Sequence, residues 1–299
     1  MGKALADTYP AARHVFEQAD DALGFSLSKL CFEGSEEDLK RTEITQPAIL
    51  TTSTAALAAL KAEHPGLDFA FAAGHSLGEW SALVAVGALE FTDAVRLVNT
   101  RGRLMQEAVP AGQGAMAAVM GLEADHIEAI CNEAAAASGE VVAPANFNSP
   151  EQTVISGTTA GVAAAQERLT AAGAKRIAHL PVSAPFHCPL MAPAARGLAD
   201  ALADVTVYKL RAQVVTNVEA APNLDPSRVK ELLVEQVTHP VRWVEVVQRL
   251  VAEGCTEAWE VGPGKVLMAL VRRIDRNLKV TPVGAPEDVH KVLQHARQA

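Results

Sequence analysis

A serine between two glycines, in Gly-His-Ser-Leu-Gly at residues 74–78, constrains the fold of this chain more than any other feature. The apolar residues 67–73 before it predict a short buried strand, and residues 79–89 after it have the apolar spacing of a helix. A strand that turns sharply into a helix around Gly-x-Ser-x-Gly is a nucleophile elbow, which exposes the serine hydroxyl at the start of the helix. The five residues alone are also compatible with an ordinary glycine-rich turn. The strand and the helix around them favour the elbow, with Ser76 as the nucleophile.

Strand and helix patterns alternate through most of the chain, which is typical of an α/β fold built on a parallel sheet. Residues 112–181 depart from this alternation, because their order is strand, helix, strand, strand, helix, strand. That order indicates a ferredoxin-like unit, with Asn-Ser-Pro at 148–150 as the turn between its second and third strands. We therefore predict a large α/β body of residues 1–111 and 182–299, with an inserted ferredoxin-like subdomain at residues 112–181.

The body is expected to contain several helices and four strands. Its helices are expected at residues 9–23, 46–62, 79–89, 92–109, 225–237, 241–253 and 265–276, with one more from about residue 190 and a last one closing the chain. Its strands are expected at residues 67–73, 213–218, 257–261 and 279–283. We expect Pro47 in the first turn of the helix over 46–62, because a proline there removes no intrahelical hydrogen bond.

A serine hydroxyl becomes a useful nucleophile when a base lies within hydrogen-bond reach. His75 is adjacent to Ser76, but neighbours around a sharp turn usually point apart. His187 lies in the proline-rich loop 181–189, between the predicted subdomain and the returning body, and is the predicted base. A purely structural loop histidine is the alternative. Residues 181–199 contain no carboxylate that could orient the imidazole, so we expect a backbone carbonyl to do so.

Charge and cysteine spacing exclude several classes of function. The formal net charge is −9, and no basic stripe suits nucleic acid. The four cysteines and nine histidines show no zinc-site spacing, so no metal is expected. No apolar stretch reaches the roughly 18 residues of a membrane span, and the charged first helix does not resemble a signal peptide. We expect a cytoplasmic protein, by default a monomer.

Several segments together resemble the bacterial malonyl-CoA:acyl carrier protein transacylases, which are related to the acyltransferase domains of fatty-acid and polyketide synthases. The resemblance runs in order over nearly the whole chain, on Gly-His-Ser-Leu-Gly-Glu at 74–79, Arg-Gly-Arg-x-Met-Gln at 101–106, Asn-Phe-Asn-Ser-Pro at 146–150, Pro-Phe-His-Cys at 185–188 and Glu-Val-Gly-Pro-Gly at 260–264. It implies a hydrolase-like α/β body with a ferredoxin-like insertion. It also implies transfer of malonyl from malonyl-CoA to acyl carrier protein through a malonyl-Ser76 intermediate, without a metal or redox cofactor.

The resemblance implies a role for each matching residue. Ser76 is the nucleophile, His187 is the general base and then the acid, and the backbone carbonyl of Gln236 orients His187. The backbone N–H of Leu77 faces the oxyanion. Arg101 pairs with the malonyl carboxylate, since its planar guanidinium can donate two parallel hydrogen bonds. The remaining predicted substrate-binding residues are Gln46, His75, Met105, Asn148 and Phe186, and the bulk of Phe186 favours malonyl over methylmalonyl.

An acidic carrier protein requires local positive charge on a chain of net charge −9. The basic pairs Lys175-Arg176 and Arg272-Arg273 are the candidates, with ordinary solvated surface charge as an equal alternative. Two rival functions are a serine esterase or thioesterase, which passes the acyl group to water, and a low-activity relative that binds carrier protein. A fatty-acid role is expected, although a polyketide acyltransferase has the same motifs.

The family's opening strand has no counterpart in this sequence. Family members begin with a strand that ends in a Phe-Pro-Gly-Gln-Gly-Ser-Gln-like turn, whose backbone supplies a second oxyanion donor. We therefore expect a core strand and this donor to be missing. A start site placed too late, an artificial shortening and a natural truncation would each explain it, and the first is preferred.

Overall fold

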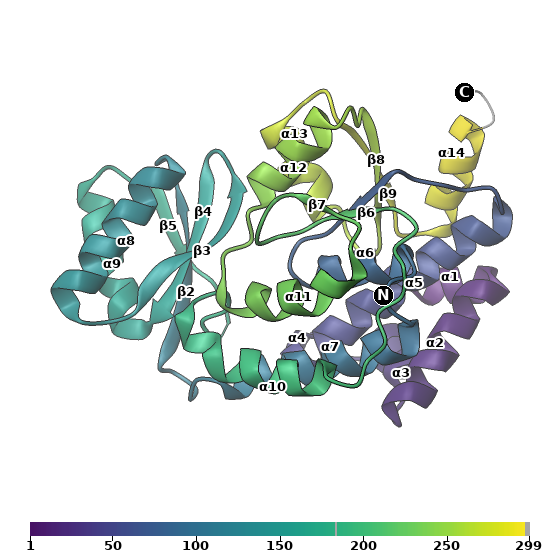
Figure 1. The fold of residues 1–299 in the computed structure, drawn as a ribbon, viewed down its shortest axis with the longest axis horizontal. Helices are drawn as coiled ribbons and strands as arrows, with labels where there is room; N and C mark the ends of the chain where they lie inside the picture. The colour runs from purple at the N-terminus through teal and green to yellow at the C-terminus, as the bar shows by residue number, and fades with distance from the viewer. Residues whose placement is uncertain (183, 297–299) are drawn as a thin grey trace.

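The computed structural model describes residues 1–182 and 184–296 of the chain (Figure 1). The first third of the chain is mostly helical, and its first three helices lie at one end of the molecule, whereas a four-stranded sheet with two helices forms the other end. The helices of the first part are α1 (Lys3–Thr8), α2 (Pro10–Leu23), α3 (Leu27–Glu33), α4 (Glu36–Lys40), α5 (Thr42–Glu63), α6 (Leu77–Ala85) and α7 (Phe91–Glu107). Residues from these helices share one apolar core, which includes the fully buried Trp80.

Helix α5 corrects the predicted helix start, because it begins at Thr42 and contains Pro47 in its interior. A proline at this position has no N–H to donate to the carbonyl of Glu43. Asn99 of α7 donates from its Nδ2 to that carbonyl oxygen over 2.7 Å, so the freed acceptor is satisfied by a neighbouring helix. Pro47 therefore leaves no carbonyl of the helix without a hydrogen bond. Helix α5 begins about one turn earlier than the sequence predicts.

The strands of the body form two separate sheets among the described residues, rather than the single parallel sheet that was expected. In the first sheet, β1 (Phe71–Ala73) pairs in parallel with β6 (Gln213–Val215), and β6 pairs antiparallel with β7 (Pro222–Asn223). In the second sheet, β8 (Glu257–Val261) pairs in parallel with β9 (Lys279–Val283). Strand β1 is shorter than the predicted 67–73, since residues 67–70 approach it as an irregular segment.

The four-stranded unit follows the predicted order of strands and helices. Its strands are β2 (Gly114–Met120), β3 (Val142–Ser149), β4 (Gln152–Thr158) and β5 (Arg176–His179), paired antiparallel in the spatial order β3-β4-β2-β5. Helices α8 (Ala124–Ser138) and α9 (Thr159–Ala171) cover one face and bury Ala117 and Val119 of β2. The alternate residues Met116 and Ala118 face the other way, where Phe186 of the body packs against them.

The rest of the body follows β5 and returns the chain to the elbow. It contains α10 (Ala192–Leu202), α11 (Val229–Thr238), α12 (Trp243–Ala252), α13 (Val266–Ile274) and α14 (Pro286–Ala296), with 3-10 turns at Pro189–Met191 and Pro226–Arg228. Between α11 and α12, Val241 forms a parallel bridge with Asn146 of β3, and its carbonyl accepts from Phe147 N over 2.9 Å. This bridge fixes the edge of the four-stranded unit beside α12, which contacts β3. No helix among the described residues is both long and apolar enough to cross a membrane.

Candidate active site

Ser76 lies at the apex of a strained turn between β1 and α6. Its backbone has φ 51° and ψ −102°, a conformation that a residue with a side chain rarely adopts. Such strain persists where the surrounding structure enforces it, and it is frequent at active sites. The Leu77 N–H is the first amide of α6, and it donates no hydrogen bond to any described residue. The turn therefore presents a hydroxyl and a free amide at a helix N-terminus, which is the arrangement that stabilises an oxyanion.

A hydrogen-bonded chain connects Ser76 to the backbone of α11. Ser76 Oγ lies 2.8 Å from His187 Nε2, and His187 Nδ1 lies 2.8 Å from the carbonyl oxygen of Gln236. A carbonyl oxygen can only accept, so the proton of the neutral imidazole is on Nδ1. Nε2 then carries a lone pair that can accept the Ser76 proton. The structure thus brings together the predicted nucleophile, the predicted base and the carbonyl predicted to orient it.

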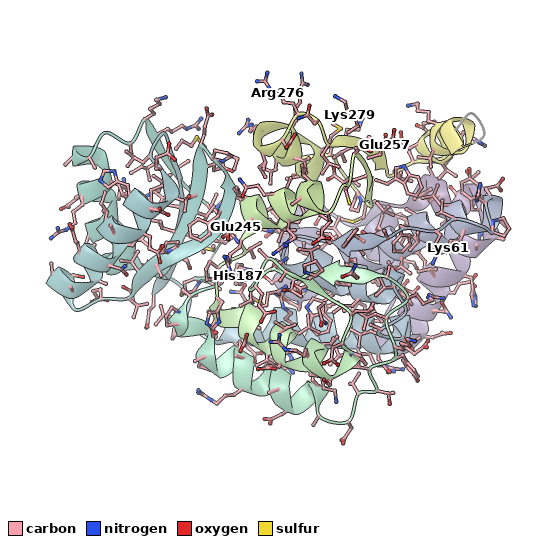
Figure 2. The ribbon with its side chains drawn as sticks, turned by 45° about the horizontal axis from the view of Figure 1, so that its top comes forward. Lys61, His187, Glu245, Glu257, Arg276 and Lys279 are labelled. Carbon is pink, nitrogen blue, oxygen red and sulfur yellow. The ribbon has the colours of Figure 1, made fainter. Side chains whose placement is uncertain are left out.

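His187 is held as a neutral base. Burial, and after it the positive charge of Arg101, lower its pKa to about 3, and the hydrogen bond to the Gln236 carbonyl opposes the change. Its side chain comes from the loop at the junction between the four-stranded unit and the body (Figure 2). The backbone of His187 also has a positive φ, of 58°. Ser183 of the same loop lies outside the described residues.

Arg101 of α7 points its guanidinium at the nucleophile. Its Nη2 donates to Ser76 Oγ over 3.0 Å and to Gln236 Oε1 over 2.9 Å, and its Nη1 donates to Gln46 Oε1 over 2.8 Å. Burial lowers the pKa of Arg101 to about 10, which leaves the side chain charged at neutral pH, and the negative charge of Glu79 opposes this shift. A cation next to Ser76 Oγ is suited to an acyl group that carries its own carboxylate.

Four hydrogen bonds made by Asn217 and Glu79, to which the sequence analysis assigns no role, support the site. Asn217, two residues after β6, accepts from Ser76 N over 2.7 Å and donates from Nδ2 to the Gly74 carbonyl over 2.8 Å. Glu79 Oε2 accepts from Asn217 N over 3.0 Å and from Gln236 Nε2 over 2.7 Å. Burial raises the pKa of Glu79 to about 7, against the lowering effect of these hydrogen bonds and of Arg101. Asn217 follows the carboxyl end of a parallel strand, where ligand-binding residues of α/β proteins are often found. This position is the one sequence feature that could have identified it.

The remaining predicted pocket residues are distributed around this centre. His75 turns away from Ser76, donates from Nε2 to Asn148 Oδ1 over 2.8 Å, and lies with its ring centre 5.7 Å from that of Trp243. Burial lowers the pKa of His75, and the hydrogen bond that it donates to Asn148 opposes the shift. Gln46 also reaches Met105, with Nε2 3.9 Å from the sulfur. His75 and Asn148 therefore join the elbow to the four-stranded unit.

The four predicted docking residues do not form one patch. Lys175 and Arg176 are exposed at the start of β5, and Arg272 and Arg273 are exposed at the end of α13. Helix α13 contacts β3, which is the opposite edge of the four-stranded sheet from β5. Three strand spacings, about 14 Å, separate these edges. The two pairs are thus separate surfaces.

Among the described residues, no group of three or more His, Cys, Asp or Glu side chains could hold a metal ion.

Known proteins are similar to this chain in sequence and in fold. The profile of a family described as acyl transferase domain matches residues 1–287. Over 298 residues the chain is 45% identical to the malonyl CoA-acyl carrier protein transacylase of Bacillus subtilis, with 100% of this chain and 93% of that protein covered. An acyl-carrier-protein S-malonyltransferase structure from Burkholderia pseudomallei matches with a TM-score of 0.94 and 45% identity, over 98% of this chain and 94% of that one. A malonyl-transacylase in complex with a type II PKS acyl-carrier protein has the same TM-score at 41% identity, over 99% and 94% of the two chains.

Proposed function

The chain belongs to the acyl transferase domain family, and we propose that it transfers a malonyl group from malonyl-CoA to the phosphopantetheine thiol of an acyl carrier protein. One observation carries this proposal above the others. Ser76 Oγ lies within hydrogen-bond distance of both His187 Nε2, at 2.8 Å, and Arg101 Nη2, at 3.0 Å. A nucleophile placed between a base and a cation can accept an acyl group and hold its free carboxylate.

In the first half-reaction, His187 Nε2 takes the proton of Ser76 Oγ as the oxygen attacks the thioester carbonyl. The resulting oxyanion faces the N–H of Leu77. The C–S bond then breaks, the CoA thiolate leaves and takes the proton from His187, and malonyl-Ser76 remains. In the second half-reaction, His187 takes the proton of the carrier protein's thiol, and the thiolate attacks the ester carbonyl. Ser76 leaves and recovers its proton from His187.

Arg101 supports malonyl as the acyl group. Once Ser76 Oγ is esterified, the carboxylate of the three-carbon malonyl chain lies within reach of the guanidinium that contacts Oγ at 3.0 Å in the free protein. A hydrogen bond to a charged group contributes about 1.5–3 kcal/mol. This corresponds to a preference for malonyl over acetyl of about 10- to 100-fold. Phe186, next to the base and packed against the four-stranded sheet, restricts the space beside the malonyl methylene.

The proposal also includes the pathway, the subdomain, the absence of a cofactor and the form of the protein in the cell. We place it in fatty-acid biosynthesis, in accordance with the names of its curated relatives, and a polyketide role is the alternative raised by the type II PKS complex. The strand order β3-β4-β2-β5 with two helices on one face supports a ferredoxin-like subdomain that carries Asn148 to the elbow. The serine, histidine and amide groups supply the nucleophile, the base and the oxyanion donor, so the proposed transfer uses no metal or redox cofactor. A cytoplasmic monomer is the proposed form.

The decisive experiment separates acyl transfer from hydrolysis and from simple binding. The protein is incubated with malonyl-CoA, and the intact protein and its peptides are weighed by mass spectrometry. We expect a malonyl adduct on Ser76 that persists until holo acyl carrier protein is added and that is absent from Ser76→Ala. Rapid release of free malonate would instead support a thioesterase. The absence of an adduct would support a low-activity relative that binds carrier protein.

A further inference from the structure

Glu79 is a buried carboxylate without a direct cationic partner. Its residue is 2% exposed, and no Lys, Arg or His nitrogen among the described residues lies within salt-bridge distance of it. A buried charge is costly unless hydrogen bonds and a nearby opposite charge offset its desolvation. Both hydrogen bonds to Glu79 come from the active site, since Asn217 N and Gln236 Nε2 donate to its Oε2. The carboxylate therefore belongs to the machinery around Ser76, although it contacts neither Ser76 Oγ nor His187.

The carboxyl group of Glu79 decides how the side-chain amide of Gln236 is oriented. Its Oε2 accepts from the backbone N–H of Asn217, which can only donate, so Oε2 acts as an acceptor and any proton of the carboxyl group is on Oε1. The Gln236 nitrogen therefore faces Oε2, at 2.7 Å. Its oxygen then faces Arg101 Nη2, at 2.9 Å. The opposite orientation would place the amide N–H groups against the donors of Arg101 and leave the Glu79 oxygen without that donor. The same nitrogen is farther from its other acceptors, at 3.1 Å from Ser76 O and 3.3 Å from Asn217 Oδ1.

The amide of Gln236 thus lies between a buried anion and a buried cation. It donates to Glu79 and accepts from Arg101, and Gln46 Oε1 holds the other terminal nitrogen of the guanidinium at 2.8 Å. Arg101 donates to the side-chain oxygens of Gln236 and Gln46 and to Ser76 Oγ. Its Nε has no partner among the described residues. Release of the Gln236 oxygen would remove one of the two protein contacts that hold the guanidinium at the nucleophile.

We propose that Glu79 is a positioning residue for acyl-group selection, which acts through the side-chain amide of Gln236 to hold Arg101 where it receives the carboxylate of the acyl group. This role rests on the proposed function and adds a residue to it. It assigns Gln236 two independent tasks. Its backbone carbonyl orients His187, and its side chain orients Arg101. The property of Glu79 that matters is an acceptor oxygen at Oε2, which a glutamine at this position would retain.

The test compares Glu79→Gln, Glu79→Met and Gln236→Met with the parent protein, and Glu90→Met serves as a surface control of the same chemistry. Single-turnover acylation of Ser76 is measured by intact mass over a range of malonyl-CoA and acetyl-CoA concentrations. We expect Glu79→Met to lower the ratio of malonyl to acetyl acylation efficiency by about tenfold or more, the loss of one hydrogen bond to a charged group. Most of the loss should appear as a higher malonyl-CoA concentration at the half-maximal rate of acylation. Glu79→Gln and Glu90→Met should keep the ratio within about threefold of the parent.

Gln236→Met keeps the backbone carbonyl that His187 uses, and it should reproduce the loss of selectivity. If circular dichroism shows that Glu79→Met does not fold, the malonyl-to-acetyl ratio of Gln236→Met tests the proposal instead. An equal slowing of acylation by both donors would identify a merely structural role and overturn the proposal. An unchanged ratio in a folded Glu79→Met or Gln236→Met would do the same. A parent protein that forms no malonyl adduct would overturn the proposed function itself, and an adduct without the change in ratio would overturn the role of Glu79 alone.

Discussion

The backbone of Gly78 passes so close to Gly74 that a Cβ added at Gly74 would lie 2.1 Å from the carbonyl carbon of Gly78. The same addition at Gly78 would meet no atom within 4 Å. The two glycines of the motif therefore have different tasks, because the close approach leaves no room at the first while the second is open. Gly78 follows the first residue of α6, where alanine has the higher helix propensity.

We expect Gly74→Ala to abolish Ser76 acylation and to lower the melting temperature, since the backbone of the elbow must move to admit a methyl group. Gly78→Ala should retain acylation within a few-fold and should be as stable as the parent or more so. Thermal unfolding and adduct formation with malonyl-CoA measure both outcomes. Equal damage from the two substitutions would contradict the contact geometry.

The pH dependence of acylation should reflect a base that stays neutral. Burial lowers the pKa of His187 to about 3, so its Nε2 remains able to accept a proton throughout the mildly acidic range. We expect the single-turnover rate of malonyl transfer to Ser76 to fall less than about threefold between pH 8 and pH 5.5. A base with the ordinary histidine pKa near 6.5 would lose about tenfold by pH 5.5. The same profile in Glu79→Gln, which lacks the titration of Glu79, serves as the control.

Stability should depend on pH through two opposing groups. The folded pKa of His187, about 3, lies below its ordinary 6.5, so its contribution to stability is present above pH 6.5 and is lost as the pH falls toward 3. The folded pKa of Glu79, about 7, lies above its ordinary 4.5, so its contribution is present below pH 4.5 and is lost as the pH rises through 7. Urea unfolding of Glu79→Gln should therefore show a gain over the parent that is larger at pH 8 than at pH 4.5. A gain that is larger at pH 4.5 would reverse the sign of the Glu79 shift.

The reacting centre is predictable from sequence because its signals are local. The spacing of glycines around Ser76 reports the elbow, and the proline-rich loop around His187 contains no carboxylate that could orient the imidazole. Glu79 and Asn217 are different, since their contacts join positions 138 residues apart, and Glu79 meets Gln236 across 157 residues. Before the fold is known, a glutamate at the start of an amphipathic helix looks like solvated surface. Its burial is a property of the assembled structure.

The fold shows the same limit at Pro47. The proline predicts a helix start by its local chemistry, but the start moves because Asn99 of another helix satisfies the freed carbonyl of Glu43. The order of strands and helices in residues 112–181 is predictable from the local sequence, and the structure has the same order. The local sequence does not identify which strands share a sheet in the body, because the pairing of β1 with β6 depends on a contact between residues 71–73 and 213–215.

Arg101 should determine which acyl donor is used. Arg101→Ala removes the cation at 3.0 Å from Ser76 Oγ and leaves Ser76 and the His187 hydrogen bond in place. We expect acylation by malonyl-CoA to fall by about 10- to 100-fold, the value of a hydrogen bond to a charged group. Acylation by acetyl-CoA, which carries no second carboxylate, should change far less. Comparable losses with both donors would show that Arg101 acts on the nucleophile rather than on the substrate.

The two basic pairs should differ in their effect on the carrier protein. Arg272 and Arg273 end the helix that packs beside β3, the strand whose Asn148 reaches the elbow, whereas Lys175 and Arg176 lie on the opposite edge of that sheet. We expect Arg272→Glu with Arg273→Glu to slow discharge of malonyl-Ser76 by acyl carrier protein, and the effect should weaken with added salt because exposed charges are screened.

Acylation by malonyl-CoA should remain near the parent rate in that double variant, since these side chains are exposed and lie outside the hydrogen-bonded network of Ser76. Lys175→Glu with Arg176→Glu carries the same change in charge and serves as the matched control, with discharge close to the parent rate. Both half-reactions are followed by intact mass. If the two double variants slow discharge equally, net charge rather than a docking surface on α13 accounts for the effect. If Arg272→Glu with Arg273→Glu slows acylation as much as discharge, α13 has no separate role toward the carrier protein.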